Sequence, residues 1–442
     1  MVHLDVPSMH SALMAFFWLD LVLQEDRSMA AEEKSQSSWS AIPLDLAGMV
    51  LRLLPGYADR SCFAAVCPQW RCAVRQQQQQ LLVPRPVPLL ALPDGTFYSL
   101  PEGKHHRFPG CGFGGYESVC GSCLVFTRDD GCFLVDPFSR DTVTLPALSC
   151  VRLRPPSAAA KRTAEVPYAA GKWSEEERTR FAYPYVTWMH ICDSDKLHIS
   201  KIVLCTPNLA AALVGNGHVS QILMCRPGAL SWSVRAYDKC RRFQDMSFYQ
   251  GKLYILTCDE DLLVVNIGQD LSTGDPQVSR IGRVIKSDPR LSVLFVDNLM
   301  ICKKHYLVES CGILLMVRRK IWCQLPERGV DKTVARKNEF EVFKADFEHS
   351  RWINVTMTMG DDQVLFLGRR CSRAMSMSQY GMPGGQIFFL DDDEKNRVEY
   401  DYAEKNTSIS VYDMRSGVVL HPRISWKRSD EMCLASWLFP QD

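Results

Sequence analysis

The sequence has almost no excess of charge of either sign. Its 442 residues include 51 Lys plus Arg and 50 Asp plus Glu, which gives a formal net charge of +1. A protein that binds nucleic acid or an anionic membrane through its general surface carries a broad excess of basic residues. The balance excludes such a surface, so we expect neither nucleic acid nor a membrane as a partner.

Long apolar runs are also scarce. The only candidate, Ala12 to Leu23, is interrupted by Asp20 and lacks both a basic flank and a small-residue cleavage site. It is too short to span a bilayer and has no signal-peptide pattern. We expect residues 1–38 to be a poorly ordered N-terminal extension, and Met29 resembles a natural start.

The 18 cysteines lie singly in apolar segments, which predicts free thiols in the cytoplasm or nucleus.

Chemistry-bearing motifs are few and incomplete. Gly110, Gly112 and Gly115 match the dinucleotide fingerprint by spacing, but a strand-like segment follows them where that motif needs a helix. Cys120 and Cys123 form one Cys-x-x-Cys pair without the second close pair that a zinc ribbon requires. We therefore predict no catalytic residue, no cofactor and no metal site.

A compact helical module is predicted over residues 39–75. Pro43 and Asp45 mark a helix start, because proline needs no N–H there and the carboxylate favours the positive end of the macrodipole. An apolar stripe follows at helical spacing, made of Leu46, Met49, Val50, Leu53 and Leu54. Asp59 is expected to cap a second helix, which Pro68 ends before a third. Three such short helices bury little, so we expect a partner or a neighbouring domain.

The same residues resemble an F-box. The match consists of Ile42-Pro43-x-Asp45-Leu46, Val50-Leu51-x-x-Leu54 and Val66-Cys67-x-x-Trp70-Arg71. The resemblance implies docking on the Skp-type adaptor of a cullin-RING ubiquitin ligase. By position, it assigns adaptor contact to Ile42, Pro43, Leu46, Val50 and Leu51, and assigns the module's own core to Leu54, Val66 and Trp70. The structural alternative is a small helical cap on the following domain.

From about residue 83 onward, short apolar runs alternate with Gly, Pro, Asp and Asn turns, as in antiparallel strands. Three stretches share one pattern of strand, polar turn and strand: 124–136, 252–266 and 386–393 with 410–413. About 360 residues of this kind exceed one sandwich but suit propeller blades of about 45 to 50 residues. The predicted fold is mainly β, with a three-helix F-box at 39–80 and a propeller of six or seven blades at 81–442.

The propeller segment is similar to the domain of unknown function that follows the F-box in many plant proteins. The sequence segments that show this resemblance are Phe248–Tyr254, Tyr306–Val317 and Val342–Asp346 followed by Trp352. It implies a non-catalytic substrate-recognition subunit of an SCF-type ligase, with an unknown protein as target. Two alternatives stay open: a non-degradative binding or scaffolding protein, and a propeller enzyme with His190, Asp193, Asp195 and His198 gathered at the channel mouth.

Overall fold

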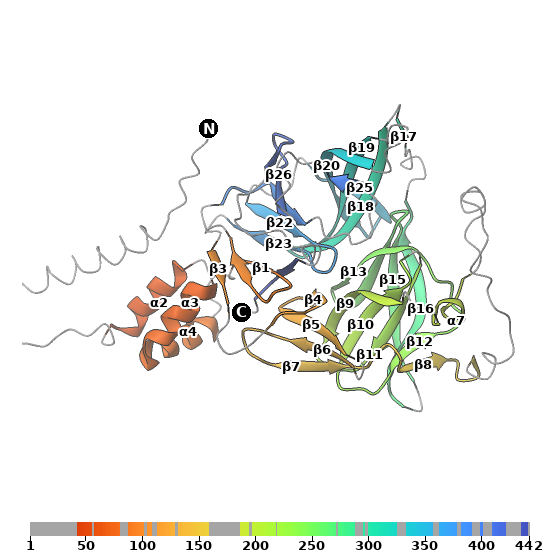
Figure 1. Ribbon diagram of the computed structural model, residues 1–442, viewed down its shortest axis with the longest axis horizontal. Coiled ribbons are helices and arrows are strands. Elements are labelled where there is room, and N and C mark those ends of the chain that lie inside the picture. Colours follow the sequence, from red (N-terminus) through yellow and green to blue (C-terminus); the bar gives the residue numbers. More distant parts are fainter. Residues whose placement is uncertain are drawn as a thin grey trace, which may run out of the picture.

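The computed structural model describes most of the chain from residue 42 onward. The described residues are 42–54, 57–79, 87–100, 104–107, 113–128, 131–158, 186–193, 197–217, 219–270, 273–287, 295–296, 299–324, 333–356, 362–377, 382–390, 398–400, 409–420 and 435–440. The expected N-terminal extension at 1–38 lies outside them. Figure 1 shows a helical unit beside a ring of β-sheets.

Three helices form the N-terminal unit: α2 (Leu44–Arg52), α3 (Tyr57–Val66) and α4 (Pro68–Gln79). Pro43 is the N-cap of α2, and its carbonyl accepts the first helical hydrogen bond from the Ala47 N–H at 3.1 Å. Pro68 opens α4, where a missing N–H costs nothing. Asp59 does not cap α3, because that helix begins two residues earlier and Asp59 lies in its first turn.

Six sheets make up the β-domain in the part of the chain that is described, which confirms a mainly β fold with a propeller of six blades. Blade one contains β28 (Ser436–Leu438), β1 (Leu89–Ala91), β2 (Phe97–Ser99) and β3 (Lys104–His106); blade two contains β4 (Ser118–Cys120), β5 (Cys123–Arg128), β6 (Gly131–Val135) and β7 (Thr142–Leu145). Blade three contains β9 (His198–Thr206), β10 (Leu209–Gly215), β11 (Ser220–Cys225), β12 (Trp232–Arg235) and β8 (Val151–Arg154).

Blade four contains β13 (Phe243–Tyr249), β14 (Lys252–Thr257), β15 (Leu262–Gln269) and β16 (Pro276–Ile285). Blade five contains β18 (Leu299–Ser310), β19 (Ile313–Gln324), β20 (Thr333–Asp346) and β21 (Arg351–Asn354), with β17 (Phe295–Val296) and β25 (Val398–Tyr400) attached. Blade six contains β23 (Arg373–Ser376), β22 (Gln363–Leu367), β24 (Gln386–Leu390), β26 (Ile409–Asp413) and β27 (Val419–Leu420).

The ring is closed by the last described strand. β28 pairs antiparallel with β1, so that Leu438 lies opposite Leu89 and Ser436 opposite Ala91. The inner strands β28, β4, β9, β13, β18 and β23 contact one another in that order. Trp437 of β28 and Met375 of β23 share one apolar cluster, which completes the circle. Strands from both ends of the domain therefore build blade one.

The three repeated stretches of the sequence form the expected antiparallel pairs. They are β5 with β6, β14 with β15, and β24 with β26. Two other hairpins turn on two residues with positive φ, Gln250-Gly251 between β13 and β14 and Cys311-Gly312 between β18 and β19. Positive φ at both positions is typical of the type I′ turn, which matches the strand twist. Glycine takes the second position in each turn because it adopts this backbone without a Cβ clash.

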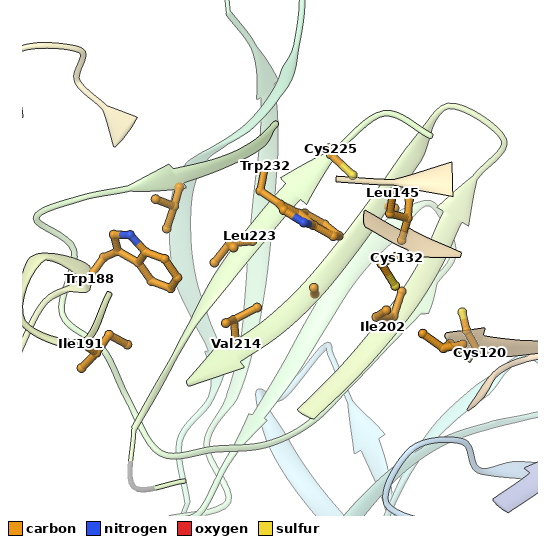
Figure 2. Packing of buried hydrophobic residues seen from close by; sticks show 14 of the residues in the cluster. Cys120, Cys132, Leu145, Trp188, Ile191, Ile202, Val214, Leu223, Cys225 and Trp232 are labelled. Atoms are coloured by element: carbon orange, nitrogen blue, oxygen red, sulfur yellow. The ribbon is translucent and has the colours of Figure 1, made fainter. Parts of the chain in front are cut away.

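Apolar layers between neighbouring sheets form the core. Figure 2 shows the layer between blades two and three, where Cys132 and Leu145 approach Ile202 and Trp232. The Trp232 side chain is fully buried, and its indole Nε1 donates to the Pro146 carbonyl at 2.8 Å. The hydrogen bond satisfies the polar atom that burial would otherwise leave unpaired. Trp232 therefore joins blade three to the end of blade two.

A buried ionic network joins blades four and five. Glu260, in the β14–β15 turn, accepts hydrogen bonds from His305 Nε2 at 2.9 Å and from Arg318 Nε at 2.8 Å. Burial alone would raise the pKa of Glu260, but the bonds from His305 and Arg318 outweigh it and lower the pKa to about 2. Arg318 also pairs with Glu341 at 2.7 Å, while the Glu260 carbonyl accepts from Trp352 Nε1 at 2.9 Å. Glu260 thus anchors a turn of blade four to blade five.

A second buried ion pair lies at the inner strands. Lys201 of β9 contacts the Asp245 carboxylate of β13, and the Leu307 N–H of β18 donates to the other carboxylate oxygen at 2.7 Å. Burial raises the pKa of Asp245, and Lys201 opposes that effect. One carboxylate therefore connects the inner strands of three consecutive blades.

Candidate functional site

The outward face of α2 is apolar and exposed. Leu46, Met49, Val50 and Leu53 follow one another at three- and four-residue spacing, which places them on one side of the helix. Met49 is 57% exposed and Leu53 is 70% exposed, while Leu46 and Val50 are half-buried. We name these four residues the α2 stripe. An exposed apolar stripe on a small helical unit is typical of a protein-docking surface.

The opposite face of α2 holds the three-helix unit together. Ala47 and Leu51, one helical turn apart, are buried against Phe63 and Trp70. The rings of Phe63 and Trp70 stack with centroids 4.3 Å apart, which joins α3 to α4. Because this core is small, the unit has little spare stability.

Two side-chain hydrogen bonds fix the ends of α2. Gln69 Nε2, from α4, donates to the Ile42 carbonyl at 3.0 Å. Arg60 Nε, from α3, donates to the Leu54 carbonyl at 2.8 Å. These bonds hold both termini of α2 against the other two helices, so the α2 stripe is presented on a positioned helix.

The sequence-predicted adaptor contacts divide into two groups. Pro43 is exposed, and Leu46 and Val50 are half-buried, with part of each side chain packed against the helical core. Ile42 is only 9% exposed, and Leu51 is fully buried. The outward assignment of Leu51 is therefore wrong for this structure, because Leu51 lies one turn after Ala47 on the inward face.

The predicted core residues of the module also divide. Trp70 is buried and Leu54 is half-buried within the helical core. Val66 was expected in that core, but it is 54% exposed. This prediction is wrong because Val66 is the last residue of α3, three positions after Phe63, and it is Phe63 that enters the core. The adaptor prediction also omitted Met49 and Leu53, although both belong to the predicted stripe.

Of the candidate enzyme residues, His190, Asp193 and His198 lie within the described ranges, and His190 has a local structural role. His190 Nδ1 lies 2.8 Å from Thr187 Oγ1 and 3.1 Å from the Thr187 N–H, at the start of the short helix α7 (Trp188–Ile191). Asp195 lies outside the described residues. Within the described ranges, no group of three His, Cys, Asp or Glu side chains is arranged to hold a metal ion. His190 is therefore accounted for as a local helix-capping residue.

The two weak motifs have structural roles where they are described. Gly110 and Gly112 lie outside the described residues, and Gly115 has a φ of +80° in a turn. Cys120 and Cys123 face each other across the β4–β5 hairpin, and burial raises the pKa of the Cys123 thiol to about 11. A protonated buried thiol is neither a good nucleophile nor a ready metal ligand.

Where helices are described, none is both long and apolar enough to cross a membrane.

Two known proteins are similar to this chain, one in sequence and one in structure. A probable F-box protein from Arabidopsis thaliana is 24% identical over 429 residues, covering 91% of this chain and 96% of its own length. The extracellular domain of a putative one component system from B. thetaiotaomicron matches at 11% identity and a TM-score of 0.22, covering 75% of this chain and 51% of its own. A TM-score that low supports no structural argument.

The family comparison covers the propeller itself. The model of the KIB1-4 beta-propeller matches residues 97–413, which begin in β2 of blade one and end in β26 of blade six. Together with the Arabidopsis relative, this match confirms the resemblance to plant F-box proteins with a C-terminal propeller. The chain belongs to the KIB1-4 β-propeller family.

Proposed function

We propose that this protein is a substrate-recognition subunit of an SCF-type cullin-RING ubiquitin ligase. The helical unit, assigned as an F-box, docks on a Skp-type adaptor and through it on a cullin. The propeller binds a protein target. The observation that carries the proposal is the α2 stripe, in which Met49 and Leu53 are largely exposed while Ala47 and Leu51 on the opposite face are buried.

The proposal gives the chain a role in proximity and not in covalent chemistry. A target held on the propeller is kept close to the conjugating enzyme that the same complex recruits. Linking two partners in this way raises their effective concentration without any new reactive group. The F-box assignment rests on the motif spacing, on the exposed stripe and on the Arabidopsis relative, whose name describes a probable F-box protein. The docking residues we propose are Pro43 and the α2 stripe.

Energetics favour the exposed residues as the main contacts. Complete burial of a Leu or Met side chain is worth about 1.5–3 kcal/mol. Since Met49 and Leu53 are more than half exposed in the free chain, their burial by a partner contributes together about 3 kcal/mol, roughly a hundredfold in affinity. Leu51 is already buried, so it supports the stripe from behind.

The test is co-purification of the full chain with a Skp-type adaptor and a cullin. The variant Met49→Asp plus Leu53→Asp should keep its fold, because both side chains are exposed, and should lose adaptor binding. A control is Leu230→Asp, which introduces one carboxylate at a propeller position that is 90% exposed. The control should bind as the unaltered chain does.

Three results would decide the matter. Loss of adaptor binding in the double variant alone supports the docking role of the α2 stripe. No binding by the folded, unaltered chain refutes the ligase proposal. Adaptor binding without ubiquitination or turnover of any co-purifying protein refutes the degradative role and favours an F-box scaffold.

A further inference from the structure

Two cysteines lie close together on neighbouring strands of blade five. Cys302 belongs to β18 and Cys323 to β19, and these two long strands pair antiparallel along their whole length (Figure 1). In this register Cys302 is opposite Ile321, and Cys323 is two residues further along β19. Because side chains alternate between the faces of a sheet, residues 302, 321 and 323 share one face. The two thiols are therefore diagonal neighbours.

The Cys323 side chain leans towards Cys302. Its Sγ lies 3.6 Å from the Ile321 carbonyl oxygen, so the sulfur is displaced back along β19 towards the residue that faces Cys302. A hydrogen bond joins the two thiols, and together with burial it raises the pKa of Cys323. Register and side-chain direction thus bring the two sulfurs into contact while both remain free thiols.

The two sulfurs differ in their access to solvent. Cys323 is fully buried, whereas Cys302 is partly exposed. Redox-sensitive cysteines are typically an accessible thiol placed beside a second thiol that can displace the oxidised group. Cys302 has the first property and Cys323 is in position for the second.

Positive charge lies near the pair. Lys304 of β18 is opposite Arg319 of β19, on the same face as the two cysteines. Both cations act to lower the pKa of the neighbouring Cys323 thiol, against the hydrogen bond and burial. Nearby cations favour the thiolate form, which is the form that reacts with oxidants. Because Cys323 holds its proton, the negative charge falls on Cys302, the sulfur that an oxidant reaches.

The pair Cys120 and Cys123 lacks this combination. These residues are direct partners across the β4–β5 hairpin, but both are buried. Burial also raises the pKa of the Cys123 thiol to about 11. An oxidant therefore meets neither an accessible sulfur nor a thiolate at that hairpin.

We propose that Cys302 and Cys323 form a reversible disulfide when hydrogen peroxide reaches blade five. The Cys302 thiolate attacks one peroxide oxygen, becomes a sulfenic acid and releases hydroxide, which is protonated to water. Cys323 then attacks the Cys302 sulfur and displaces the hydroxyl group, which leaves as water with the proton of Cys323. The two thiols lose two electrons, and one peroxide is reduced to two waters.

The proposed disulfide should be easy to reduce. Diagonal residues of paired strands are separated by about 7–8 Å, whereas the Cα atoms of a relaxed disulfide are about 4.4–6.8 Å apart. The bond must therefore draw the strands together, and a strained disulfide is readily reduced. The site lies within the propeller, so it holds whether or not the helical unit docks on an adaptor.

The test is peptide mapping of the full chain after treatment with hydrogen peroxide. Free thiols are blocked with iodoacetamide, and the protein is digested with trypsin without a reductant. Trypsin cleaves after Lys303 and Lys320, so the two cysteines fall in separate peptides that only a disulfide can join. We expect the joined peptides after peroxide treatment, and their loss when reduced glutathione is added before digestion.

Two variants assign the role of each sulfur. Cys323→Ser leaves the Cys302 sulfenic acid without a neighbouring thiol, so dimedone should label Cys302 more strongly than in the unaltered chain. Cys302→Ser, at the partly exposed position, should abolish both the joined peptides and the oxidation of Cys323. It keeps the test valid even if the buried substitution prevents folding. The control Cys311→Ser removes an exposed thiol from the β18–β19 turn and should leave the disulfide unchanged.

Three results would overturn the proposal. Oxidation of Cys302 in the folded chain without the joined peptides would show that the strands do not allow the bond. A reduced Cys302 under conditions that oxidise the exposed Cys311 would show that peroxide does not reach it. Loss of the joined peptides in Cys311→Ser would show that oxidation begins at Cys311.

Discussion

Replacing Glu260 with Gln should destabilise the propeller by about 3 kcal/mol at pH 7. The pKa of this buried carboxyl is lowered from 4.5 to about 2, chiefly because His305 and Arg318 donate to it against the cost of burial. At about 1.36 kcal/mol per pKa unit, the ionised form contributes about 3 kcal/mol more than a neutral one. Gln has the same shape without the charge, so the variant isolates that contribution.

The pH dependence of the difference gives the sharper test. A carboxyl whose pKa is lowered by folding stabilises the protein above its unfolded pKa, and the stabilisation disappears as pH falls through the folded pKa. The difference between the unaltered chain and Glu260→Gln should therefore shrink from about 3 kcal/mol at pH 7 to about 1 kcal/mol at pH 3. Urea unfolding at several pH values measures it.

A charge-matched control separates this local effect from general acid unfolding. Glu348, in the β20–β21 turn, is exposed, and Glu348→Gln should change stability by less than about 0.5 kcal/mol at any pH. The reasoning is refuted if Glu260→Gln unfolds at the same urea concentration as the unaltered chain at pH 7. A constant difference between pH 7 and pH 3 would also refute it, because the loss would then be independent of ionisation.

Two further changes test the helical unit and the inner strands. Trp70→Ala should cost about 3–5 kcal/mol by removing the ring stacked on Phe63, and should make residues 44–79 sensitive to limited proteolysis; unchanged resistance would contradict the packing described. Lys201→Met leaves Asp245 buried without its ion pair and should cost about 3–5 kcal/mol. Because burial already raises the pKa of Asp245, that deficit should shrink as pH falls from 7 towards 4 in thermal melts, and a growing deficit would contradict the argument.

Local signals in the sequence predict where helices begin better than they predict which side of a helix is buried. Pro43 and Pro68 mark helix starts because a missing N–H is tolerated only there, and the structure begins α2 and α4 at or beside them. The inward and outward sides of α2 were harder to predict, because apolar residues occupy both. Nothing in the spacing alone distinguishes Leu51, which is buried, from Leu53, which is 70% exposed.

Long-range pairing accounts for what the sequence did not predict. The strand β8 joins β12 in parallel, with Arg154 opposite Arg235, although about 80 residues separate them. A cavity lined by Arg154, Arg235 and Ser279 exists only because of this pairing and the approach of β16. Likewise, the sequence predicts six or seven blades without deciding between them, since blade five contains three strands of 12 to 14 residues that follow no fixed repeat.

The pairing of Leu438 with Leu89 has a consequence for how the protein is made. During synthesis the chain emerges from its N-terminal end, and domains generally fold as units as they appear. The helical unit and the first strands, β1–β5, emerge long before β28. Because β1 pairs with β28, the ring cannot close until β28 has been synthesised. Loss of β28 alone would therefore remove the strand that closes blade one, while leaving the N-terminal helices intact.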